Sequence, residues 1–126
     1  MTPEQDIERV ITSVHAQSGH WPYTKDADLY IGYRPGEEEF SFGAGRILRT
    51  QVSYDIVICA VRTDAAAAQM EALRYRLYAA LIDAGWHFDG APGPESYAPA
   101  QGQFMWPVRV KKGFAVGRDG QPCGLT

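Results

Sequence analysis

The feature that most constrains the fold is residues 50–86, TQVSYDIVICAVRTDAAAAQMEALRYRLYAALIDAGW. Apolar and polar residues first alternate, and residues 56–61 are then apolar without interruption. This pattern predicts a long strand over residues 47–62, or two strands joined at a bulge, whose second half is covered on both faces. Helical spacing then predicts a long helix. Its expected core face consists of Ala66, Met70, Leu73, Leu77, Tyr78, Leu81 and Ile82.

Both ends of this helix carry boundary signals. Asp64 is a suitable N-cap because its carboxylate can accept a hydrogen bond from the first turn. Gly85 is the expected residue just past the C-terminus, and Trp86 can then fold back onto the last turn. The stretch therefore predicts a strand connected directly to a helix that packs on the sheet.

An earlier helix is predicted over residues 3–18. Thr2 can cap it, Pro3 suits its first position, and Gly19 can end it. Its apolar residues share one face at helical spacing, namely Ile7, Val10, Ile11 and Val14.

The remaining segments predict shorter strands and loops. Residues 29–34 alternate as a strand, and Pro and Gly after Arg34 predict a turn with an acidic tip at Glu37, Glu38 and Glu39. Residues 40–45 give no clear signal.

Residues 89–103 (DGAPGPESYAPAQGQ) predict a flexible loop, since they are rich in Pro, Gly and Ala. Residues 104–111 predict a strand with Pro107 at an edge or bulge, and residues 113–126 predict a hairpin-like segment with a frayed end.

The element order is thus α-β-β-α-β in a single domain of residues 1–126. We expect an α+β fold with a mostly antiparallel sheet and both helices packed on one face.

Composition excludes several classes of protein. The net charge of −3 argues against a nucleic-acid binder. The longest apolar run is six residues, so no membrane-spanning segment is expected, and the polar N-terminus does not resemble a signal peptide. Cys59 and Cys123 are expected to stay unpaired in a cytoplasm, where the chain would be made.

Charge is distributed unevenly along the chain. Residues 1–45 hold eight acidic and three basic residues, whereas residues 96–126 hold one acidic and four basic residues. Such asymmetry suits head-to-tail contact between copies.

No catalytic or metal-binding pattern is present in the sequence. His15 and His20 lie five residues apart across Gly19, His87 lies far from both, and no CxxC or HExxH motif occurs. No nucleophile-elbow motif occurs either. We therefore predict no enzyme activity, no cofactor and no metal site.

Residues 52–62 (VSYDIVICAVR), the helix ending in Ala84, Gly85 and Trp86, and the later strand at residues 104–111 together resemble tail terminator and tail-completion proteins of long-tailed bacteriophages or prophages. An initial helix is also usual in that family. The resemblance implies a structural protein that forms a ring, often six-fold, caps the tail tube and joins it to the head. Its implied partners are further copies of itself, the tail tube protein and head–tail connector proteins, within a virion assembled in the host cytoplasm. A neck protein would look similar at this level.

An alternative interpretation is a small cytoplasmic ligand-binding or regulatory α+β domain, because fold class alone decides little about function. For the assembly protein, charge predicts the contacts between copies. The expected contact residues are Glu37, Glu38, Glu39, Arg109, Lys111, Lys112 and Arg118.

Overall fold

The computed structural model describes residues 1–21, 27–98 and 102–124. Its elements in chain order are α1 (Pro3–Val14), β1 (Ser18–His20), β2 (Leu29–Gly43), β3 (Arg46–Val61), α2 (Asp64–Asp83), β4 (His87–Phe88), β5 (Ser96–Ala98), β6 (Gln103–Val116) and β7 (Pro122–Gly124). The predicted α+β class and the main order α-β-β-α-β are confirmed.

The strands form one sheet built around the long antiparallel β2–β3 hairpin, with β6 antiparallel to β3. The other edge of β6 pairs in succession with β5, β4 and β7. On its outer side, β2 pairs only with β1, in parallel at Ile31, Gly32 and Tyr33. Within the described residues, the rest of the outer edge of β2 therefore has no strand neighbour.

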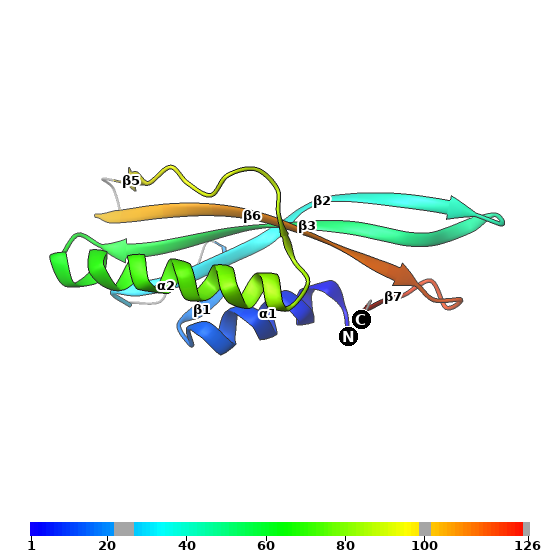
Figure 1. Cartoon of the computed structure of the whole chain (residues 1–126), viewed down its shortest axis with the longest axis horizontal. Helices are drawn as coiled ribbons and strands as arrows, with labels where there is room; N and C mark the ends of the chain where they lie inside the picture. Colours follow the sequence, from blue (N-terminus) through cyan, green and yellow to red (C-terminus); the bar gives the residue numbers. More distant parts are fainter. Residues whose placement is uncertain (22–26, 99–101, 125–126) are drawn as a thin grey trace.

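Both helices pack on one face of the sheet, as predicted (Figure 1). Alternate β3 residues from Val52 to Ala60 are buried in the same core cluster. The helices contribute Ile7, Val10 and Ile11 from α1 and Ala66, Met70, Leu73, Leu77 and Leu81 from α2. Burial of each large apolar side chain contributes about 1.5–3 kcal/mol, which holds the helices on the sheet.

Helix α2 largely confirms the predicted strand-to-helix stretch. Its cap is Thr63 instead of Asp64, because the Thr63 hydroxyl accepts the hydrogen bond from the Ala66 N–H at 3.1 Å. Gly85 has the left-handed backbone expected past the C-terminus, with φ of 90°. Trp86 is buried and packs edge-on against Tyr54 and Phe114.

The prediction of a turn after Arg34 is wrong. β2 continues to Gly43, with an irregularity in register between Pro35 and Glu38. Proline is tolerated here because, among the described residues, no strand pairs with the outer edge of β2 at Pro35, so a missing N–H breaks no ladder bond there. The hairpin turns instead at Ala44 and Gly45, whose φ angles of 52° and 74° suit a tight two-residue connection.

Helix α1 is shorter than predicted. It ends at Val14, and Ser18–His20 form β1, so Gly19 lies in a strand and does not end the helix. Hydrogen bonds to β2 hold this segment extended, since the Ile31 N–H donates to the Gln17 carbonyl and the Trp21 N–H donates to the Tyr33 carbonyl. The N-terminal signal is confirmed, because Thr2 and Gln5 form a capping box.

The hairpin extends well beyond the two helices (Figure 1). We call residues 40–49, at its far end, the arm. Its residues are exposed except for Gly43 and Ile47, which are half-buried. The arm is therefore a part of the sheet that the helices of its own chain leave uncovered.

The two segments predicted to be loose are partly built into the sheet. Residues 113–116 belong to β6, and β7 pairs with them. In the 89–103 segment, β5 pairs with the start of β6, while residues 99–101 lie outside the described part of the chain. Residues 125–126 lie outside it as well. No described helix is long and apolar enough to cross a membrane.

Candidate interaction surfaces

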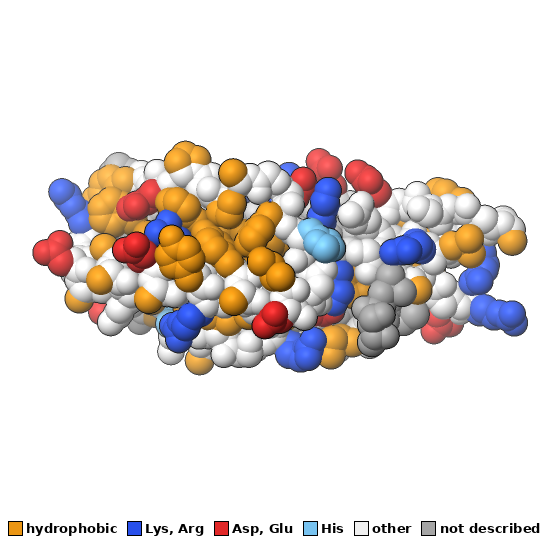
Figure 2. Space-filling view, in the orientation of Figure 1, with side chains coloured by type: hydrophobic (Ala, Val, Ile, Leu, Met, Phe, Trp, Pro, Cys, Tyr) orange, Lys and Arg blue, Asp and Glu red, His pale blue; other side chains and the backbone are white. Residues whose placement is uncertain are grey.

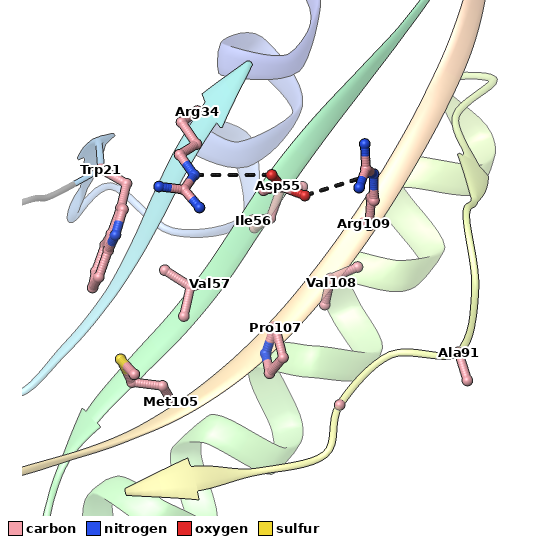
Figure 3. Close-up of a pocket in the computed structure, with 11 residues that line it drawn as sticks. Trp21, Arg34, Asp55, Ile56, Val57, Ala91, Met105, Pro107, Val108 and Arg109 are labelled. Carbon is pink, nitrogen blue, oxygen red and sulfur yellow. Dashed lines mark ion pairs between the residues drawn. The ribbon is translucent and has the colours of Figure 1, made fainter. Parts of the chain in front are cut away.

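A charged row crosses the sheet face that lies opposite the helices (Figure 3). Asp55 of β3 is in register with Arg34 of β2 and Arg109 of β6. Its carboxylate lies 3.8 Å from Arg34 Nε and 3.7 Å from Arg109 Nε. Strand register alone thus brings together three charges from distant parts of the sequence.

Arg109, at the β6 end of this row, has the most polar partners. Its guanidinium also lies 3.4 Å from the Asp89 carboxylate and 3.8 Å from the Glu37 carboxylate, and it donates to Ser53 Oγ at 3.2 Å. The ion pairs are partly exposed, so each contributes little to stability. They orient the charged side chains on the sheet face opposite the helices, which we call the open face.

Beside the charged row lies a groove of about 410 Å³ (Figure 3). Its apolar part is formed by Trp21, Val57, Met105 and Pro107, and the segment at Ala91 and Gly93 forms one wall. The Gly93 N–H donates to the Pro107 carbonyl at 2.8 Å, which holds that wall against β6. The groove therefore combines an apolar floor with charged groups at one end.

A buried ion pair joins three elements on the helix side of the sheet. Lys112 Nζ of β6 donates to Asp6 Oδ2 of α1 at 2.6 Å and to the Ala84 carbonyl at the end of α2 at 2.7 Å. Trp86 Nε1 donates to the other Asp6 oxygen at 3.3 Å. The Lys112 side chain is 10% exposed. The positive charge also lies at the negative end of the α2 dipole, which favours it there.

The described residues contain no cluster of three potential metal ligands. Two of the histidines have partners within the chain: His15 Nε2 lies 2.7 Å from the Leu29 carbonyl oxygen, and His20 Nε2 lies 2.7 Å from the Glu4 carboxylate.

Cys59 is buried in β3 and is predicted to be chemically inert. Burial raises the pKa of its thiol, and a hydrogen bond with Tyr30 lowers it by a smaller amount. The net pKa is about 11. The reactive thiolate is therefore about 100-fold scarcer near neutral pH than for a thiol with the ordinary pKa. In a Cys123→Ser background, a thiol reagent at pH 8 should label the native protein at least about 100-fold more slowly than the urea-unfolded protein. Equal labelling rates would contradict this assignment.

The structure places the predicted contact residues in different environments. Glu37, Glu38 and Glu39 lie within β2 and not at a tip, and Arg118 is exposed in the turn before β7. Glu37 and Arg109 face one another within a single chain, so this pair needs no second copy. Lys111 also has an internal partner, since its Nζ lies 3.9 Å from the Asp89 carboxylate.

The structure corrects the prediction that Lys112 is a contact residue. Its side chain is buried against Asp6 and cannot reach a neighbouring molecule. Sequence reasoning treated it as a surface lysine. Its partner lies 106 positions away in the sequence, so no local pattern identifies the pair.

Two exposed apolar surfaces were missed from the sequence. The first is the arm, with Phe40, Phe42 and Leu48 exposed. The second runs along α2 opposite its buried face, and we call it the outer stripe: Ala65, Ala68, Ala72, Tyr75, Ala79 and Ile82. Its alternating spacing of three and four residues is a detectable helical signal. Ile82, predicted to lie in the core, is 58% exposed and belongs to this stripe.

No protein-family model matches the chain, and a search of curated proteins returns no match.

Proposed function

We propose that this chain is a structural virion assembly protein, a ring-forming tail terminator or tail-completion protein that caps the tail tube and joins it to the head. The observation that carries the proposal is the β2–β3 hairpin, which extends past the helices and exposes Phe40, Phe42 and Leu48. Large exposed apolar side chains grouped on one projecting element are typical of surfaces that other proteins cover.

The sequence resemblance supports the same role. The segment that carries it, residues 52–86, forms β3 and α2 with the left-handed Gly85 and the buried Trp86 that the pattern predicts. In this proposal the partners are further copies of the chain, the tail tube protein and head–tail connector proteins, and the protein functions in the tail or neck of the virion. The role requires no catalytic residue, cofactor, nucleic acid or membrane.

Deleting the gene from the phage or prophage genome that carries it tests this role. We expect filled heads and tails that remain unjoined, or tails of uncontrolled length, in negative-stain electron micrographs of the lysate. Supplying the wild-type chain from a plasmid should restore joined particles. Normal virions from the deletion strain would overturn the proposal.

The groove on the open face favours a second candidate, a small ligand-binding or regulatory domain. Its volume of about 410 Å³ lies within the ~300–1,000 Å³ range of small-molecule sites, and it combines apolar residues with a few charged groups. A thermal-shift screen of small amphipathic acids and amines tests this candidate. A specific ligand whose stabilising effect disappears in Val57→Trp, which fills the groove, would favour it, and the absence of any such ligand would leave assembly as the better reading.

A further inference from the structure

Helix α2 has a second apolar face, which the described part of the chain leaves uncovered. Its buried face packs on the sheet, and all six residues of the outer stripe on the opposite side are exposed. Tyr75 and Ile82 are 64% and 58% exposed. Figure 2 shows hydrophobic side chains gathered over the half of the molecule that contains α2 in Figure 1. A helix that is apolar on opposite faces normally has a neighbour on both of them.

The outer stripe has the spacing of a coiled-coil interface. Its six residues follow one another at intervals of three, four, three, four and three. This is the a and d pattern of a heptad repeat. The a positions are Ala65, Ala72 and Ala79, and the d positions are Ala68, Tyr75 and Ile82.

This pattern indicates that the missing neighbour is another helix. The stripe runs for about 25 Å along α2, at a rise of about 1.5 Å per residue. Alanine at every a position lets a second helix approach closely, and the two large side chains at d then pack against it.

Charges on the two flanks of the stripe indicate which helix this is. With Ala65 at a, Glu71 falls at g and Arg76 falls at e, on opposite sides of the stripe. Both are exposed, and within the described residues neither has an ion-pair partner in its own chain. In a parallel pair of helices, a g residue meets the e residue five positions further on in the other helix. Arg76 lies five positions after Glu71, so two copies of α2 are complementary to one another.

We infer that two copies of this chain pair through the outer stripes of their α2 helices, in parallel, about a two-fold axis that runs along the helices. Glu71 of each copy meets Arg76 of the other, so the ion pair forms twice. The stripe is its own partner in this contact, as two-fold symmetry requires. The inference goes beyond the proposed function and does not depend on it, because the contact leaves the arm and the open face of both copies uncovered.

The charges also select the orientation of the pair. In a parallel pair, the other flank contacts join Asp64 to Gln69 and Tyr78 to Asp83, so no like charges meet. In an antiparallel pair, g residues lie beside g residues and e residues beside e residues. Glu71 would then lie near Glu71 of the second copy and Arg76 near Arg76. Like charges side by side disfavour that orientation.

Exchanging the flank charges in the full chain tests the contact. Glu71→Arg brings arginines together, and Arg76→Glu brings glutamates together. Each should raise the dissociation constant of the dimer at least about 5-fold in sedimentation equilibrium, because two ion pairs become two repulsive pairs. The double variant Glu71→Arg/Arg76→Glu restores opposite charges and should associate like the wild type.

The matched control is Arg46→Glu, which makes the same charge change in the arm and should associate like the wild type. Glu71, Arg76 and Arg46 are all exposed, so every variant should keep the wild-type circular dichroism spectrum. Tyr75→Ser removes the large side chain at the middle of the stripe and should raise the dissociation constant at least about 10-fold.

Disulfide trapping tests the orientation. In a Cys123→Ser background, Ala65→Cys introduces a thiol near one end of the stripe. In a parallel pair the two introduced thiols face one another and should form an intermolecular disulfide under mild oxidation. In an antiparallel pair they would lie about 25 Å apart, too far to join. Ala67→Cys is the control, because it is exposed on α2 outside the stripe and should cross-link much more slowly.

Three results would each overturn the inference. They are a wild-type chain that stays monomeric up to about 100 μM, single charge variants that associate like the wild type, and Ala65→Cys chains that cross-link no faster than Ala67→Cys chains. Recovery of the dimer by the double variant, together with rapid cross-linking through Ala65→Cys, is the result that supports it. The deletion experiment on whole virions tests the proposed function separately, so each can fail without the other.

Discussion

Replacing Lys112 with methionine is expected to lower the free energy of unfolding by about 3–5 kcal/mol, because it leaves the buried Asp6 carboxylate with only the exposed Arg9 guanidinium, 3.7 Å away, as a positive partner. Lys112 Nζ lies 2.6 Å from that carboxylate and 2.7 Å from the Ala84 carbonyl oxygen. One substitution thus removes the charged group that joins α1, the end of α2 and β6. Thermal melts should show a decrease in Tm of about 10–20 °C.

Lys111→Met is the matched control. Lys111 is adjacent in β6 and partly exposed, and its Nζ is 3.9 Å from Asp89, so its loss should change stability by no more than about 1 kcal/mol. The double variant Asp6→Leu/Lys112→Met should be more stable than Lys112→Met, since it removes both buried charges together. If Lys112→Met and Lys111→Met melted alike, the buried pair would not be important for stability.

Replacing Leu77 with alanine is expected to lower the free energy of unfolding by about 2–5 kcal/mol. Leu77 is 0% exposed and lies in the middle of the buried face of α2. Truncation removes apolar contacts and leaves a cavity that a long, tightly packed helix cannot readily close. Urea unfolding, with the slope unchanged, measures the loss.

Ile82→Ala on the same helix provides the comparison. Ile82 is 58% exposed, so its truncation should change stability by less than about 1 kcal/mol. Equal destabilisation by the two alanine substitutions would mean that the assignment of the two α2 faces is wrong.

Much of the fold was predictable because its signals are local. The alternation in residues 47–62 and the apolar spacing from Ala66 to Leu81 each depend on near neighbours, and both elements form where they were predicted. Gly85 and Trp86 likewise signal a helix end through backbone freedom and one bulky apolar residue. These are preferences that a short segment expresses by itself.

The hairpin was harder to predict because its signals conflict. Pro35 and Gly36 usually end a strand, and the three glutamates after them are typical of a solvated turn. β2 continues to Gly43 because it pairs with β3, and because no described strand pairs with its outer edge at Pro35, where proline is therefore tolerated. The location of the arm therefore depends on a neighbouring strand and not on its own residues.

The sequence by itself determined the α+β order and the strand-to-helix connection. It did not determine which apolar residues of α2 face the sheet, since Ile82 and Leu81 both fit a helical stripe and packing chooses between them. Nor did it locate Lys112, whose burial depends on a carboxylate brought to it from α1 by the tertiary fold. Apolar periodicity is a property of neighbouring residues, whereas burial and charge pairing are properties of surfaces that only the folded chain brings into contact.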